Sequence, residues 1–255
     1  MKGAIWLALS TVVTGLGQEP IVSFKSAPDS LQIAGGRISK GQVLVADNEY
    51  WGVIRAAGDL ALDFGRVTGT NYTLSNGKSS SSPAAYPYRP VNNFNNTVYT
   101  TTGAANYSGP AYSDPAPSDT VVIAGTIGHS TIIDALIASK AIDVSAVKGK
   151  WESFTSQVVK NPVPGCSAAL VIAGSDPRGT IFGIYDVSEQ IGVSPWYFWA
   201  DSPVRSNKNI YALSKKKVQG PPTVKYRGFF LNDEQPALTN WVAYVVHIQL
   251  HISIC

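Results

Sequence analysis

Two adjacent carboxylates follow an apolar run near the end of the sequence, where the letters read YRGFFLNDEQPALTNW. The run predicts a strand over residues 223–231, with Asn232, Asp233 and Glu234 directly after it. Side chains at the C-terminal ends of strands line the active sites of α/β barrels, and glycoside hydrolysis commonly uses a carboxylic acid with a carboxylate. Alternatively, Asp233 or Glu234 caps a helix that begins near Pro236. The residues alone favour cap and catalyst equally, and at most one of the two acids faces a site if strand geometry continues.

Glu189 is a third acidic residue of interest, because it lies near the C-terminal end of a predicted helix. A carboxylate in that position opposes the helix dipole. Its side chain therefore either points to solvent or is held in this position for a function. Taken alone, Glu189 is interpreted as a solvated residue.

A glycine-containing turn, GTIGHS at residues 125–130, follows a predicted strand and precedes a predicted helix. Free N–H groups at such a turn favour anions. Neither a Gly-Lys-Ser/Thr ending nor a G-x-G-x-x-G spacing is present, so a packing turn is favoured over a phosphate site. His129 is accordingly expected to be a capping or surface residue, and Cys166 is not expected to be a nucleophile.

Four consecutive aromatic residues occupy positions 196–199 within the letters PWYFWAD. Aromatic rings can stack on sugars, but a cluster this dense is more often an anchor in a hydrophobic core. The core interpretation is favoured.

These residues need elements to position them, and the apolar pattern predicts an alternation of strands and helices. Gly, Pro and a stiff Gly220-Pro221-Pro222 stretch separate the elements. Asp47 and Asn48 are candidate caps for the first helix, and Ser175 or Asp176 for the last. Strands are expected over residues 42–46, 120–124, 151–159 and 168–173, and helices over 50–64, 130–140 and 177–192. The prediction is a three-layer α/β domain over residues 21–221, with residues 151–159 as an edge or antiparallel strand.

The chain has 255 residues, of which 15% are charged, and a formal net charge of +3. No basic face for nucleic acid emerges, and the run Lys215, Lys216 and Lys217 is expected to lie in a solvated loop. One lysine followed by a short apolar segment predicts a signal peptide over residues 1–17 and a secreted, extracellular protein. The segment is too short to span a bilayer, so no membrane anchor is expected.

Residues 68–119 are rich in turn formers and predict a long polar insertion. The insertion contains three N-glycosylation sequons, at Asn71, Asn95 and Asn106, which are expected to carry glycans. The chain has two cysteines, Cys166 and Cys255. A disulfide framework is therefore not expected.

Two long motifs resemble glycoside hydrolase family 115, the xylan α-1,2-glucuronidases. They are GSDPRGTIFGIYDVSEQIGVSPWYFWADSPV (residues 174–204) and VKYRGFFLNDEQPALTNW (residues 224–241). The stretches DNEYWGVIRAAGDLALDFGRVTG and VKGKWESFTSQVV are also similar to that family, so the resemblance extends over residues 33–241.

The resemblance implies inverting removal of glucuronic acid, or its 4-O-methyl form, from glucuronoxylan or aldouronic acids, without a metal or organic cofactor. It implies an α/β domain that precedes a TIM-like barrel. Matched motif to motif, Glu189 and Asp233 are the implied catalytic carboxylates, and Asn232 and Glu234 the implied substrate-binding neighbours.

Residues 223–241 provide only the first strand of such a barrel, which needs about 250 residues. The letters VAYVVHIQLHISIC at residues 242–255 do not resemble the family's continuation. The expectation is a fragment of the enzyme, inactive by itself. The competing hypothesis is a non-catalytic secreted module that binds acidic xylan through residues 196–199.

Overall fold

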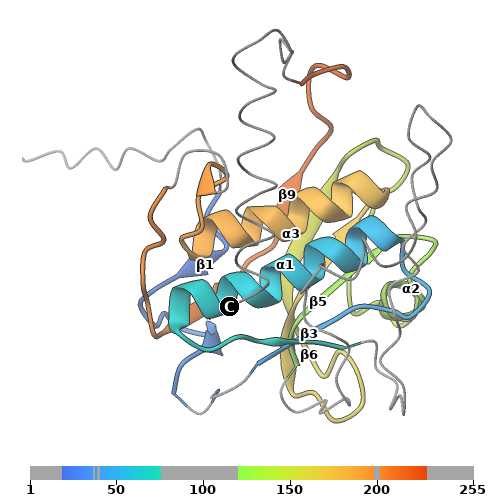
Figure 1. The fold of residues 1–255 in the computed structure, drawn as a ribbon. Helices are drawn as coiled ribbons and strands as arrows, with labels where there is room; N and C mark the ends of the chain where they lie inside the picture. The colour runs from blue at the N-terminus through green and yellow to red at the C-terminus, as the bar shows by residue number, and fades with distance from the viewer. Residues whose placement is uncertain (1–18, 37, 39–40, 76–119, 198–201, 229–255) are drawn as a thin grey trace, which may run out of the picture.

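The computed structural model describes residues 19–36, 38, 41–75, 120–197 and 202–228 of the chain, which form a mixed α/β domain (Figure 1). The larger of its two sheets has six strands in the order β4-β3-β5-β7-β6-β9. The strands are β3 (Gln42–Leu44), β4 (Thr73–Ser75), β5 (Thr120–Thr126), β6 (Phe154–Lys160), β7 (Ala168–Gly174) and β9 (Lys217–Gln219). Strands β4, β3, β5 and β7 are parallel, whereas β6 runs antiparallel to both β7 and β9.

Helices cover both faces of this sheet and make three layers. Helices α1 (Trp51–Thr68) and α3 (Pro177–Ile191) lie side by side on one face (Figure 1), and their buried side chains share one apolar core. Helix α2 (Thr131–Ala138) packs on the other face through Ile133 and Leu136. The predicted three-layer α/β arrangement is confirmed. Among the described helices, none is long and apolar enough to cross a membrane.

A second, smaller sheet joins the beginning of the domain to its end. It has the order β1-β8-β2, from β1 (Val22–Ser23), β2 (Leu31–Ala34) and β8 (Ile210–Ala212), and all its pairs are antiparallel. Ile21, Ile33 and Ile210 are fully buried in the core shared by α1 and α3.

Helix ends follow the local sequence, with one exception. Asp176 caps α3, accepting the N–H of Gly179 at 2.7 Å, with proline in the first turn and left-handed Gly192 at the C-cap. The predicted cap at Asp47 or Asn48 is wrong, because α1 begins after Tyr50 without a side-chain cap. Asn48 instead donates to the carbonyl oxygen of His129.

Several predicted boundaries also differ from the structure. The predicted insertion begins too early, because residues 73–75 form β4 beside β3. Strand β6 is antiparallel as predicted but is not an edge, since β9 pairs with its outer side. Residues 223–228 form no strand, and the remainder of the predicted strand, from 229 onwards, lies outside the described residues.

Candidate functional site

A cleft of about 740 Å³ opens beside α3, and several polar and charged side chains line it. One wall is the outer face of α3, and the other is the segment that leaves β9, residues 219–227. The polar and charged residues that line it are Asp63, Glu152, Tyr185, Asp186, Ser188, Glu189, Ser194, Gln219 and Arg227. The cleft thus joins the two segments that carry the motifs of residues 174–204 and 224–241.

Glu189 lies in the last turn of α3, exposed to solvent, and lines this cleft. The backbone carbonyl of Glu189 accepts the N–H of Gly192, the C-cap residue at which α3 ends. The structure therefore places Glu189 where a bound molecule can reach its carboxylate. Its catalytic role stays a prediction.

Asp63 of α1 is a second carboxylate at the cleft, with 4% of the residue exposed. Burial raises the pKa of Asp63, and the neighbouring Ser188 hydroxyl and Arg66 guanidinium act in the opposite direction more weakly. Arg66 forms an ion pair with Asp63 and also lies over the ring of Tyr197, with 5.0 Å from its Cζ to the ring centroid. The sequence carries no signal for Asp63, because charged and apolar residues are mixed along this helix.

Asp186, which lines the cleft, forms a buried ion pair with Lys217, with 2.6 Å between Nζ and Oδ1. The side chains are 2% (Lys217) and 6% (Asp186) exposed. The expected solvated loop for the lysine run is therefore wrong at Lys217, which is the first residue of β9 and points inward. Lys215 and Lys216 are partly exposed, and Lys216 pairs with Asp143.

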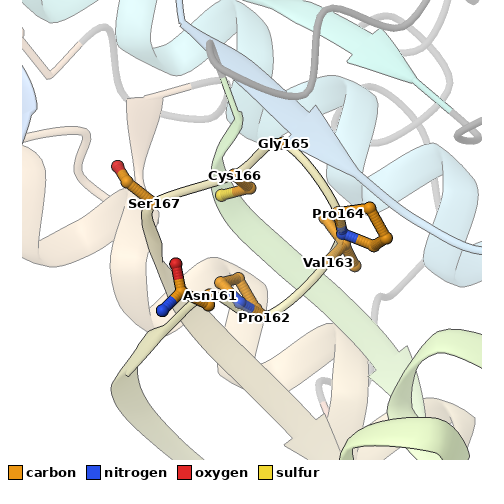
Figure 2. A pocket seen from close by; sticks show the side chains of 7 residues that line it. All are labelled: Asn161, Pro162, Val163, Pro164, Gly165, Cys166 and Ser167. Atoms are coloured by element: carbon orange, nitrogen blue, oxygen red, sulfur yellow. The ribbon is translucent and has the colours of Figure 1, made fainter.

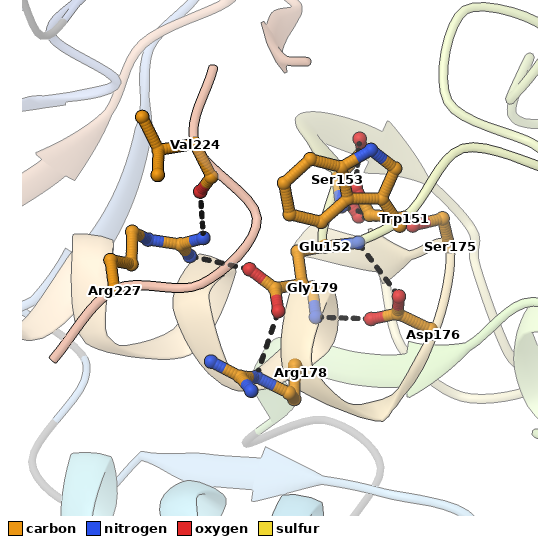
Figure 3. Close-up of polar contacts among 9 residues, drawn as sticks. All are labelled: Trp151, Glu152, Ser153, Ser175, Asp176, Arg178, Gly179, Val224 and Arg227. Atoms are coloured by element: carbon orange, nitrogen blue, oxygen red, sulfur yellow. Dashed lines mark hydrogen bonds and ion pairs between the residues drawn. The ribbon is translucent and has the colours of Figure 1, made fainter. Parts of the chain in front are cut away.

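Glu152 lies between two arginines at the mouth of the cleft (Figure 3). One carboxylate oxygen is 3.1 Å from Arg178 Nε, and the other contacts Arg227. The guanidinium of Arg227 also lies over the rings of Trp151 and Phe182, at 5.9 and 5.6 Å. This group joins the turn before β6, the first turn of α3 and the segment after β9, and the sequence offered no spacing signal for it.

The aromatic cluster is not simply a core anchor where the structure describes it. Trp196 is 53% exposed, and Tyr197 is partly buried against the main core. Phe198 and Trp199 lie outside the described residues. Tyr185 of α3 is 43% exposed and donates to Asp59 at 2.8 Å.

The glycine turn at residues 125–130 is a packing turn. The carboxylate of Glu49, a residue only 6% exposed, accepts the N–H groups of Thr126 (2.8 Å) and Tyr50 (2.9 Å). Ligands of open α/β sheets bind at the carboxyl ends of adjacent strands whose connections diverge, and β3 and β5 form such a pair here. The Glu49 carboxylate therefore accepts the N–H groups that an anionic ligand could otherwise use. His129 is partly exposed and stacks on Tyr50, with 3.9 Å between the ring centroids.

A second hollow, of about 630 Å³ and largely open, is lined by the loop of residues 161–167 between β6 and β7 (Figure 2). Cys166, a free thiol, lines it, with Sγ 3.5 Å from the carbonyl oxygens of Thr120 and Ala168. Burial raises the pKa of the Cys166 thiol, which favours the protonated form. This hollow contains no acid or base for catalysis.

The other predicted site residues stand as follows. Asn232, Asp233 and Glu234 lie outside the described residues, as do Asn95 and Asn106 and the predicted signal peptide. Asn71 is exposed between α1 and β4. Among the described residues, no three His, Cys, Asp or Glu side chains are grouped so that they could hold a metal ion.

Two comparisons with known proteins relate the chain to glycosyl hydrolases. The model of "Glycosyl hydrolase family 115" matches residues 219–252, a range that begins in β9 at the cleft wall. A solved structure titled a family GH115 4-O-methyl-α-glucuronidase, BtGH115A, "with specificity for decorated arabinogalactans", matches with a TM-score of 0.55 and 27% sequence identity. No curated protein matched the sequence.

Both matches are to glycoside hydrolase family 115, so the chain is related to that family. The match covers 83% of this chain and 21% of the solved one, so the chain spans about a fifth of that enzyme's length. The matched family range runs past Trp241, and the interpretation of residues 242–255 as a separate tail stays a prediction.

Proposed function

We propose that this chain forms the α/β part of a secreted glycosidase that removes glucuronic acid, or its 4-O-methyl form, from a glucuronylated polysaccharide. The observation that carries the proposal is that both comparisons match segments that line the same cleft. The structural match covers most of the domain that positions Glu189, and the family match begins at Gln219 on the opposite wall.

In this proposal Glu189 and Asp233 are the carboxylates of an inverting hydrolysis. Inverting glycosidases use one carboxylic acid to protonate the leaving oxygen and one carboxylate to activate water, separated by room for that water. Asn232 and Glu234 would contact the sugar beside Asp233. Glu189 is supported by its exposure on the cleft wall, and the other three by the motif FLNDE within the matched family range.

The polysaccharide is proposed to be glucuronoxylan. Decorated arabinogalactans are the alternative, because they are the substrates named for the solved relative. Secretion is supported by the apolar leader pattern and by the sequons at Asn71, Asn95 and Asn106. We expect no turnover by this chain alone, since it spans about a fifth of the relative's length.

Calorimetric titration with a glucuronylated xylotetraose tests the proposal, with unsubstituted xylotetraose as the matched control. Binding of the acidic sugar only, weakened by Glu189→Gln and accompanied by no released glucuronic acid, is the expected result. Failure of both sugars to bind would contradict the assignment of the cleft. Release of glucuronic acid would overturn the expectation that the chain is inactive alone, while supporting the glycosidase assignment.

A second candidate function is a non-catalytic module that binds acidic xylan. The 53% exposure of Trp196, beside the cleft at Pro195, favours it, because an exposed indole can stack on a sugar ring. In that case Trp196→Ala abolishes binding of the xylotetraoses, whereas Glu189→Gln leaves it unchanged. The two variants therefore discriminate between the two functions.

A further inference from the structure

Contacts other than the one with Arg227 fix the position of Glu152. Its backbone φ is 48°, a left-handed conformation that is unusual for a residue other than glycine. The N–H of Glu152 donates to Asp176 Oδ2 at 2.7 Å, and Asp176 Oδ1 accepts from Gly179 at 2.7 Å (Figure 3). The cap of α3 therefore fixes the position from which the Glu152 carboxylate projects.

Arg227 joins the segment after β9 to that carboxylate. The segment forms no strand over residues 223–228, and Arg227 Nη1 donates to the carbonyl oxygen of Val224 at 2.9 Å, closing the loop on itself. Among the described residues, the polar contacts between residues 222–228 and the rest of the domain are those of Arg227. One side chain thus attaches this wall of the cleft to the turn before β6.

The attachment can open without leaving a buried charge alone. The Arg227 side chain is 35% exposed, whereas that of Glu152 is 9% exposed and is also paired with Arg178. If Arg227 leaves, its guanidinium reaches water and Glu152 keeps a cation. The large penalty for breaking a buried pair applies only when a partner is left uncompensated.

We propose that the Glu152–Arg227 ion pair is a latch that holds residues 220–228 closed as one wall of the cleft. The latch does not depend on the proposed glycosidase function.

A nitroxide label on residue 226 tests the latch by its local mobility. Tyr226 is 86% exposed, so Tyr226→Cys in a Cys255→Ser background gives a label next to Arg227, while buried Cys166 does not react. Glu152→Gln and Arg227→Gln should each shorten the label's rotational correlation time roughly two- to threefold, because the segment is released. The double variant should do no more than either single one, and Arg227→Lys should recover part of the loss.

Arg178→Gln is the matched control, because it removes a guanidinium from the same carboxylate without touching the segment. It should leave the label's mobility unchanged. If Arg178→Gln mobilises the label as much as Arg227→Gln, or if Glu152→Gln has no effect while its melting temperature is unchanged, the latch is overturned. Since the readout needs no substrate, this result is distinguishable from failure of the proposed glycosidase function.

Discussion

At the scale of single residues, the ion pair of Lys217 and Asp186 ties three distant segments together. The other oxygen of Asp186 accepts from Gln190 at 2.8 Å, and Gln190 Oε1 accepts the N–H groups of Ile21 (2.7 Å) and Val22 (3.2 Å). The network therefore connects β9, α3 and the first described strand. A buried pair that is broken on one side leaves an uncompensated charge, which is the costly case.

Lys217→Met should lower the free energy of unfolding by roughly 3–5 kcal/mol, because Asp186 then stays buried without its cation. Urea denaturation measures this change. Lys216→Met is the matched control, since its partner Asp143 is exposed to solvent, and it should change the stability far less than Lys217→Met. The double variant Lys217→Met with Asp186→Leu should recover much of the loss, and equal effects of the two single lysine variants would contradict this account.

Asp63 makes stability depend on pH in a defined direction. Since its pKa is raised by burial in the folded state, the folded protein binds more protons than the unfolded one as pH rises above the ordinary value of 3.8. The Asp63 contribution to the free energy of unfolding is therefore largest at or below that pH and declines as pH rises through the folded-state pKa.

Asp63→Asn should remove this decline. Compared with the wild type, the variant should gain stability as pH rises above 3.8 and through the folded-state pKa of Asp63, as measured by urea denaturation at each pH. Taking the difference between the two proteins cancels the other carboxyl groups, including Asp143, whose lowered pKa acts in the opposite sense. A difference that is flat or falls with pH would contradict the account.

At the scale of elements, α3 approaches the sheet more closely than side chains on its inner face would allow. A Cβ on Gly179 would lie 2.3 Å from the carbonyl oxygen of Ser153, and one on Gly183 would lie 2.6 Å from Ile172 Cγ2. The glycines of the motif GSDPRGTIFG therefore have a packing role. Close approach of α3 brings its cap to Glu152 and its outer face to the cleft.

Gly179→Ala should destabilise the protein by roughly 1–3 kcal/mol, despite alanine's greater helix propensity, because the clash is with backbone. Thermal unfolding followed by circular dichroism gives the measurement. Gly52→Ala in α1 is the control, since its Cβ would meet only the end of Ile181 at 3.3 Å, and should change stability by less than about 0.5 kcal/mol. A stabilised Gly179→Ala protein would show that the close approach is not required.

At the scale of the whole molecule, apolar patterning was sufficient to predict the layers but not the site. The buried strands β5 and β7 are continuous apolar runs, and the Asp176 cap of α3 is a local signal. Contacts between residues far apart in sequence carry no such signal, so Lys217 was misread as solvated and Glu152 was not noticed. Glu189 was found through a family motif rather than from physical reasoning about its helix.

The sequons make a prediction for the intact chain. If it is secreted from a eukaryotic cell, each of Asn71→Gln, Asn95→Gln and Asn106→Gln should reduce its mass by one glycan in mass spectrometry. Thr73→Ala tests Asn71 independently, because it removes the sequon while keeping the asparagine. An unchanged mass in all three variants would contradict the predicted passage through the secretory pathway.

The small sheet has a consequence for biosynthesis. Strand β1 pairs with β8 through Val22 and Ala212, so the first strand of the domain must await a partner made about 190 residues later. At typical translation speeds that interval lasts roughly 10–40 s. During it, Ile21 and Ile33, which end fully buried, lack their β8 neighbour and are available to chaperones. This sheet therefore cannot close until synthesis has passed Ala212.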